Sequence, residues 1–202
     1  ELCQDALHVE QSILNENVGS QDQTAAAYGG FNKIKFKRNA QPIVSPVFIQ
    51  RHRRVQLENN LMFFFTRFSR LSDTIAKAQI DKTPKLTTEL STMKSMVNQA
   101  IDILSSERND LNQFGELLHD TWIIKRTLTD KITNPDIDKY YYLARVAGAI
   151  GGKLCGAGGG GFFLFFVPPQ RQDAVKIALA ELLHVPFDFE YNGTQVVFNS
   201  HY

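Results

Sequence analysis

The strongest candidate for a functional site in this 202-residue chain is a run of glycines toward its C-terminal end. Positions 156–161 read Gly-Ala-Gly-Gly-Gly-Gly, so five of the six residues have no side chain. Such a run loses much conformational entropy on folding and favours neither helix nor strand. Bare backbone can approach a ligand closely, and its successive amide N–H groups can converge on phosphate oxygens. The run therefore predicts a phosphate-binding loop, and the alternative is a flexible turn into a core strand.

The flanking segments decide which kind of phosphate loop is predicted. The run satisfies the pattern G-x-G-x-x-G, but a dinucleotide-binding fold needs a strand before that pattern and a helix after it. Here a helix is predicted before the loop and a strand, FFLFF, after it. A Walker loop is also excluded, because no Gly-Lys-Ser/Thr closes the motif and Lys153 lies upstream of it.

A second candidate for chemistry is Asp22, in the segment NENVGSQDQTAAAYGGF. Ser20 and Gln23 have the spacing of a capping box, so Asp22 falls in the first turn of a short helix that Gly29 ends. The positive end of the helix dipole favours an ionised carboxylate there, which can accept or orient a hydroxyl proton. The alternative is an acid that only stabilises the helix.

The elements that must position these residues are of mixed type. Periodicity and cap residues predict helices at 2–14, 20–28, 70–80, 86–104, 111–122, from 134 onward, and at 171–183. Strands are predicted at 31–36, 55–66 and 162–167, with a hairpin over 187–198 on the Asn192-Gly193 turn. This mixture predicts an α+β fold.

The segment 38–54 is predicted to be a linker or a domain boundary. It contains Pro42 and Pro46, and it ends in the basic cluster RHRR. Arg51, Arg53 and Arg54 could contact a phosphate, but a basic surface turn is the favoured interpretation.

Composition removes several classes of function. The 22 basic and 21 acidic residues leave a net charge of +1, too little for non-specific nucleic-acid binding. No window approaches the roughly 18 to 20 apolar residues of a membrane span. Cys3 and Cys155 are far apart and lack metal-ligand spacing, so no metal site is predicted and a reducing cytoplasm is the expected compartment.

The segment GGKLCGAGGGGFFLFFVP resembles the third motif of the GHMP kinases, the family of galactokinase, homoserine kinase and mevalonate kinase. The resemblance implies a ferredoxin-like C-terminal domain with added helices, whose glycine loop lies against the phosphates of ATP. It assigns ATP binding to Gly156, Ala157, Gly158, Gly159, Gly160 and Gly161. Cys155 stands where the family commonly has Ser, and we interpret it as a packing residue.

The segment GSQDQ resembles the family's catalytic-aspartate site, which makes Asp22 the catalytic candidate. Its implied role is to accept or orient the proton of the substrate hydroxyl that attacks the γ-phosphate of ATP. Gln21, Gln23 and Tyr28 become candidate sugar contacts because they lie near Asp22 in the sequence, although Tyr28 can equally be a core aromatic.

Several longer stretches, among them FFFTRFSRLSDTIAKAQI and LHDTWIIKRTLTDKITNPDID, resemble the branch of the family that phosphorylates D-glycero-D-manno-heptose 7-phosphate at its anomeric hydroxyl, a step toward GDP-heptose. A phosphosugar needs cationic partners, and Lys125 and Arg126 are the candidates. Their alternative role is that of a solvated helix end. Alternative functions are a kinase for fucose or galactose and a non-catalytic sugar-sensing module.

The resemblance also implies a division of the chain into two parts. Residues 1–45 would be the end of an N-terminal kinase domain that carries the aspartate loop, and residues 46–202 would be the C-terminal domain. The family's upstream phosphate loop, which helps to hold Mg²⁺, does not occur in these 202 residues. We therefore expect that an upstream portion is absent and that the chain alone is inactive. The expected partners are ATP with Mg²⁺ and a phosphosugar, with neither nucleic acid nor membrane, and a homodimer is left open.

Overall fold

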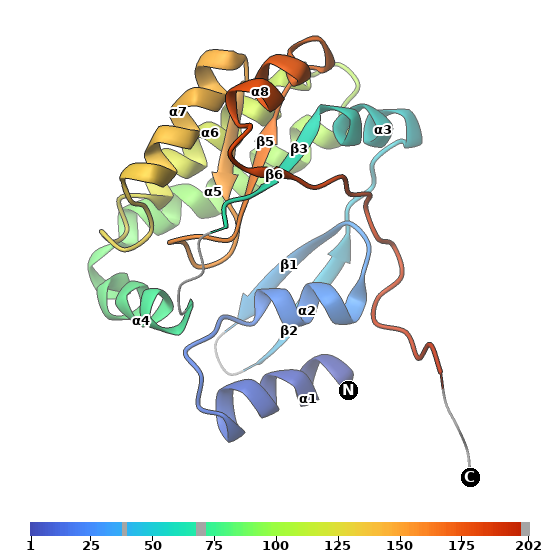
Figure 1. The fold of residues 1–202 in the computed structure, drawn as a ribbon. Coiled ribbons are helices and arrows are strands. Elements are labelled where there is room, and N and C mark those ends of the chain that lie inside the picture. The colour runs from blue at the N-terminus through green and yellow to red at the C-terminus, as the bar shows by residue number, and fades with distance from the viewer. Residues whose placement is uncertain (38–39, 68–71, 199–202) are drawn as a thin grey trace. The chain divides into compact units, whose positions relative to one another are not determined.

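The computed structural model describes residues 1–37, 40–67 and 72–198 (Figure 1). These residues form two compact units: unit 1 comprises Glu1–Phe48 with the segment from Asp188, and unit 2 comprises Ile49–Phe187. Each unit is described by itself. The division into family domains at residues 45 and 46 stays a prediction.

The described residues of unit 1 form short helical segments and one small sheet. Helix α1 (Leu2–His8) continues into a π-helical turn (Val9–Ile13), as predicted for residues 2–14. Helix α2 (Gln21–Tyr28) is followed by strands β1 (Asn32–Lys37) and β2 (Ala40–Pro46), which pair antiparallel. The unit thus holds the segment that carries Asp22 on a short helix.

The predicted capping box at the start of α2 is wrong. Ser20 is the N-cap residue, but its side chain makes no capping hydrogen bond. Its hydroxyl accepts from the Gln11 amide instead (3.2 Å), and the Gln23 amide donates to the Glu10 carboxylate. Contacts with the preceding helical segment therefore replace the local cap.

Strand β2 lies inside the segment that was predicted to be a linker. Its two prolines, Pro42 and Pro46, are tolerated because both strands of a two-stranded sheet are edge strands. The prediction of a linker is therefore wrong for β2, whereas the boundary between the two units, at Phe48 and Ile49, does fall inside residues 38–54.

The predicted hairpin over residues 187–198 is also wrong, since no strand is present from Val185 to Phe198. This segment runs along the end of α2: the Thr194 amide donates to the Ala26 carbonyl (2.9 Å), and the Gly30 amide donates to the Glu190 carbonyl (3.1 Å). The two backbones approach so closely that a Cβ on Gly29 would lie 2.3 Å from the Gly193 nitrogen. Pairing with α2 therefore takes the place of pairing within the segment.

Unit 2 is built around a four-stranded antiparallel sheet in the order β4-β5-β3-β6. Its strands are β3 (Leu61–Phe65), β4 (Gly151–Leu154), β5 (Phe162–Phe166) and β6 (Leu183–His184). Burial alternates along β3, as expected for a strand with one face in the core. The antiparallel sheet with helices confirms the predicted α+β class.

The segment predicted as a strand over residues 55–66 begins instead as helix α3 (Arg51–Asn60), and β3 follows directly. Arg53 and Leu57, one helical turn apart, are both buried. The Arg53 guanidinium donates to the carbonyls of Ile103 (2.9 Å) and Asn109 (2.7 Å), both distant in sequence. The prediction of a basic surface turn is therefore wrong for Arg53.

The described part of unit 2 contains further helices, of which α6 (Asn112–Lys125) packs directly against strands of the sheet (Figure 1). The others are α4 (Ser72–Lys82), α5 (Thr87–Ser105), α7 (Pro135–Ala147) and α8 (Gln172–Ala178). These confirm the predicted helices, although α8 ends earlier than expected. In the described residues, no helix combines the length and apolar character that crossing a bilayer requires.

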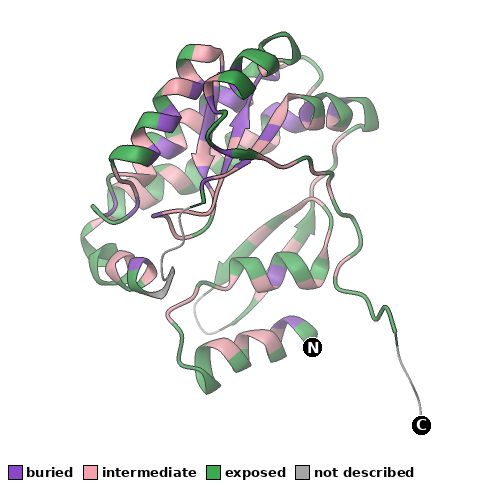
Figure 2. Cartoon of the chain, viewed as in Figure 1, coloured by how far each residue is buried: buried purple, intermediate pink, exposed green. Residues whose placement is uncertain are grey.

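The core of unit 2 lies between the helices and the sheet, where the buried residues of both gather (Figure 2). Trp122 of α6 meets Phe163 of β5 edge to face, with ring centroids 6.5 Å apart, and neither residue is exposed. Tyr141 of α7 packs on the same rings, and burial raises the pKa of its hydroxyl to about 12. That hydroxyl lies 2.8 Å from Nδ1 of His119.

Asn134→Ala is expected to lower the free energy of unfolding by about 1 kcal/mol. The Asn134 side chain caps α7 by accepting a hydrogen bond from the Ile137 amide (2.9 Å), and alanine would leave that amide without its partner. Urea unfolding followed by circular dichroism measures the change. Asn134→Ser is the matched control, because its hydroxyl can restore the cap, and equal losses in both variants would contradict the explanation.

Candidate functional site

The glycine loop joins two antiparallel neighbours, β4 and β5. A strand and not a helix therefore precedes it directly, which corrects the predicted order of elements. The glycines of GGKL concealed this strand, because glycine is rare in strands. In the fold they are needed for packing: a Cβ on Gly151 would lie 1.8 Å from the Gly115 carbonyl oxygen of α6. Dinucleotide binding remains excluded, since a strand follows the loop.

The conformation of the loop requires glycine at several positions. Gly156 (φ +75°), Gly158 (φ +119°), Gly159 (φ +72°) and Gly161 (φ +98°) all have positive φ, which L residues with side chains rarely adopt. Gly158 is doubly restricted, because a Cβ there would lie 2.8 Å from the Cα of Ile132. The glycine run is thus a turn with a defined backbone conformation and not a flexible connection.

Side chains from three different elements bind the carbonyl groups of the loop. The Lys125 ammonium donates to the carbonyls of Leu154 (3.1 Å) and Gly156 (2.6 Å) from the end of α6. The Gln79 amide of α4 donates to the Ala157 carbonyl (2.7 Å). Thr66, after β3, donates to the Gly161 carbonyl from both its hydroxyl (2.9 Å) and its amide (2.8 Å).

In the described part of the chain, fewer amide groups than carbonyl groups of the loop take part in hydrogen bonds. The Gly159 amide donates to the Ile132 carbonyl (2.8 Å). Within residues 1–37, 40–67 and 72–198, the other loop amides have no hydrogen-bond acceptor: Gly156, Ala157, Gly158, Gly160 and Gly161. A short stretch with its carbonyls held and its N–H groups available is suited to bind an anion.

Lys125 and Arg126 are adjacent in sequence but have different partners. Lys125 binds the glycine loop, whereas Nη2 of Arg126 pairs with Oδ2 of Asp138 in α7 at 2.8 Å. The other carboxylate oxygen of Asp138 accepts from the Thr133 hydroxyl (2.6 Å). Arg126 thus links the end of α6 to the start of α7. The segment between these two helices contains Ile132, which contacts the loop.

An acidic residue also lies on the segment before α7. Asp130 accepts a hydrogen bond from the Thr129 hydroxyl (3.0 Å) and lies 3.6 Å from the Lys82 ammonium. The hydrogen bond, and less strongly the lysine, hold the pKa of Asp130 below its usual range.

In unit 1, Asp22 lies exposed in the first turn of α2. Gln21 is also exposed, and Gln23 is half-buried and bonded to Glu10. Tyr28 is 51% exposed, so it is not a core aromatic. One helix thus holds all four residues, while the glycine loop belongs to unit 2 and is described separately.

Sequence reasoning missed two residues that contact the loop, Thr66 and Gln79. They lie 95 and 78 positions from the loop residues that they bind. Threonine after a strand and glutamine on a helix are common, so no local signal marked them.

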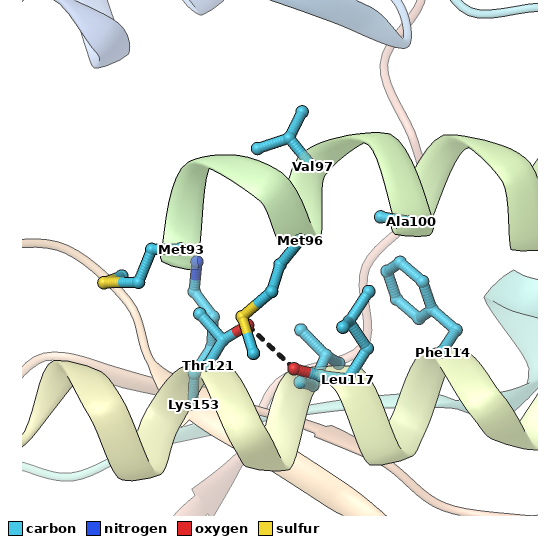
Figure 3. A pocket seen from close by; sticks show the side chains of 9 residues that line it. Met93, Met96, Val97, Ala100, Phe114, Leu117, Thr121 and Lys153 are labelled. Atoms are coloured by element: carbon cyan, nitrogen blue, oxygen red, sulfur yellow. Dashed lines mark hydrogen bonds between the residues drawn. The ribbon is translucent and has the colours of Figure 1, made fainter. Parts of the chain in front are cut away.

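An apolar pocket of about 190 Å³ lies between α5 and α6 (Figure 3). Its lining includes Met93 and Met96 from α5, Leu117 and Thr121 from α6, and Lys153 from β4. The Thr121 hydroxyl donates to the Leu117 carbonyl (2.7 Å) and so adds little polarity to the wall. The lining includes no residue of the glycine loop.

Among the residues that the structure describes, no three His, Cys, Asp or Glu side chains are grouped so that they could hold a metal ion.

Residues 84–184, half of the chain, match the family model described as GHMP kinases C terminal. A D-glycero-alpha-D-manno-heptose 7-phosphate kinase of Campylobacter jejuni is 33% identical over 175 residues, which are 85% of this chain and 51% of that protein.

Among solved structures, a D-glycero-D-manno-heptose 1-phosphate kinase of Bacteroides thetaiotaomicron is 27% identical, with a TM-score of 0.65 over 95% of this chain and 52% of that one. Lactococcus lactis galactokinase is 16% identical, with a TM-score of 0.63 over 96% of this chain and 60% of that one, and it supports the fold alone. The chain spans about half the length of the heptose-phosphate kinases that it matches.

Proposed function

Because this chain belongs to the GHMP kinases, we propose that it supplies the phosphate-binding loop and the catalytic aspartate of an ATP-dependent sugar kinase. The observation that carries the proposal is the state of the glycine loop. The carbonyls of Gly156, Ala157 and Gly161 are held by Lys125, Gln79 and Thr66, respectively, and five of the loop amides have no acceptor among the described residues. Amides available in this way are suited to phosphate oxygens.

The proposed reaction transfers the γ-phosphoryl group of ATP to a sugar hydroxyl. The hydroxyl oxygen attacks the γ-phosphorus, the bond to the β-phosphate oxygen breaks, and ADP leaves with the electron pair. Such a transfer asks the protein mainly for positioning and for stabilisation of negative charge. The residues proposed to bind ATP are Gly156, Ala157, Gly158, Gly159, Gly160 and Gly161.

Asp22 is the proposed catalytic residue, and it would accept or orient the proton of the attacking hydroxyl. Its exposed position in the first turn of α2 leaves the carboxylate accessible. Mg²⁺ enters the proposal only as the partner of the ATP phosphates. Because the reaction consumes ATP, we place it in the cytoplasm.

The proposed acceptor is D-glycero-D-manno-heptose 7-phosphate, which would be phosphorylated at the anomeric hydroxyl for GDP-heptose synthesis. Support comes from the Campylobacter jejuni relative, which is named for that substrate. Gln21, Gln23 and Tyr28 remain proposed contacts of the sugar, and Arg126 remains a proposed contact of its distal phosphate. Lys125, which the resemblance also assigned to that phosphate, instead donates to the carbonyls of Leu154 and Gly156.

Release of ADP from ATP by the full-length protein, measured with each of three acceptors, tests this proposal. We expect kcat/KM for heptose 7-phosphate to exceed that for fucose and galactose at least about a hundredfold, because a site with polar groups for a phosphate discriminates strongly against ligands that lack it. Omission of the acceptor sets the background. A preference for galactose or fucose would contradict the substrate, and no release with any acceptor would favour a sugar-sensing module.

A further inference from the structure

We propose that Lys125 and Gln79 are positioning residues that set the direction of two amides of the glycine loop, those of Ala157 and Gly158. This inference rests on the proposed function, because it assumes that those amides bind the phosphates of ATP. It gives Lys125 a role directed at the nucleotide, whereas the resemblance assigned it to the sugar phosphate.

Peptide geometry carries the first step. In a trans peptide the C=O of one residue and the N–H of the next point in opposite directions, and the described chain contains no cis peptide bond. Lys125 holds the carbonyl of Gly156, so the amide of Ala157 points away from Lys125. Gln79 holds the carbonyl of Ala157, so the amide of Gly158 points away from Gln79.

The same opposite orientation of C=O and N–H applies to the peptide bond between Leu154 and Cys155, where the acceptor of the amide is present in the structure. Lys125 also holds the carbonyl of Leu154, and the next amide, that of Cys155, donates to the Phe162 carbonyl across the strand pair (2.8 Å). The amides of Ala157 and Gly158 have no such acceptor among residues 1–37, 40–67 and 72–198. Two successive amides with fixed directions can bind a phosphate oxygen.

The chemical nature of Lys125 suits this role. Its hydrogen bonds to two carbonyls are charge-assisted and therefore stronger than neutral ones. It is also the last residue of α6, where the negative end of the helix dipole favours a cation. Without it, the carbonyls of Leu154 and Gly156 would lose their shared donor, at the point where Gly156 adopts a φ of +75°.

Lys125→Met and Gln79→Met test the inference in the full-length protein, because methionine keeps the length of each side chain and removes its donor. Isothermal titration with ATP is expected to show affinity weakened about tenfold for either variant, the loss of a hydrogen bond that orders a charged ligand. In kinetics, the KM for ATP should rise while the KM for heptose 7-phosphate stays within twofold. Lys125→Arg should recover part of the affinity, since a guanidinium can also reach two carbonyls.

Lys176→Met is the control for loss of one positive charge, because Lys176 lies on α8 and pairs with its helix neighbour Asp173 (3.6 Å). It should bind ATP like the wild type. If wild type binds ATP and both methionine variants bind it equally well, the inference is wrong while the proposed function stands. A rise in the KM for the sugar phosphate alone would also overturn it, in favour of direct substrate contact by Lys125. If wild type does not bind ATP, the proposed function itself fails. Should Lys125→Met not fold, Gln79→Met decides by the same criteria.

Discussion

Asp22→Asn is expected to lower kcat of the full-length kinase by about 10²- to 10⁴-fold, the range that a positioned acid or base contributes. Asparagine keeps the size of the side chain but cannot accept the hydroxyl proton. Because Asp22 is exposed, the substitution should leave the fold intact. The steady-state rate of ADP release with heptose 7-phosphate measures the loss, and circular dichroism checks the fold.

Asp5→Asn provides the matched control for this experiment. Asp5 is another exposed acid in the first turn of a helix of unit 1, and no catalytic role is proposed for it. Its substitution should leave kcat unchanged. Full turnover in Asp22→Asn would remove Asp22 from the catalytic role, and equal losses in both variants would indicate a general effect of negative charge in unit 1.

Gly151→Ala is expected to lower the free energy of unfolding by about 3 kcal/mol or more, at the upper end of what overpacking costs. The added Cβ would lie 1.8 Å from the carbonyl oxygen of Gly115 and 2.9 Å from its carbonyl carbon. These are backbone atoms, so no side-chain rotation can relieve the overlap, and α6 must move away from β4. Urea unfolding of the full-length protein measures the change.

Gly156→Ala serves as the comparison within the same unit. A Cβ at Gly156 would meet nothing within 4 Å, so the only cost arises from the positive φ of +75°. That cost is about 1 to 2 kcal/mol. A loss at Gly151 no larger than the loss at Gly156 would contradict the close approach of α6 and β4.

The sequence predicted those elements whose signals are local. Asn134 followed by Pro135 predicted the start of α7, and the Asn134 side chain does cap that helix. Apolar spacing predicted α5 and α6, and the run FFLFF predicted β5. The family resemblance of the glycine motif is confirmed by the match over residues 84–184.

The failures occurred where distant partners decide the local structure. The first turns of α3 were predicted to be a basic surface turn, but Arg53 donates to the carbonyls of Ile103 and Asn109, which lie 50 and 56 positions away. The Asn192-Gly193 turn was predicted to close a hairpin, but its segment hydrogen-bonds to the end of α2. In both cases, hydrogen bonds to residues distant in sequence, and not the local sequence pattern, decided which structure the segment adopts.

By itself, the sequence determined that a glycine loop lies at Gly156–Gly161 and that Asp22 lies at the start of a helix, because glycine content and helix-start signals are properties of adjacent residues. Only the tertiary structure decided that β4 precedes the loop, and that Lys125, Gln79 and Thr66 hold its carbonyls. Those contacts join residues that lie 31, 78 and 95 positions apart, so they exist only once the sheet and helices have brought them together. The direction of a loop amide is set by the residue that binds the preceding carbonyl, and that residue is distant in sequence.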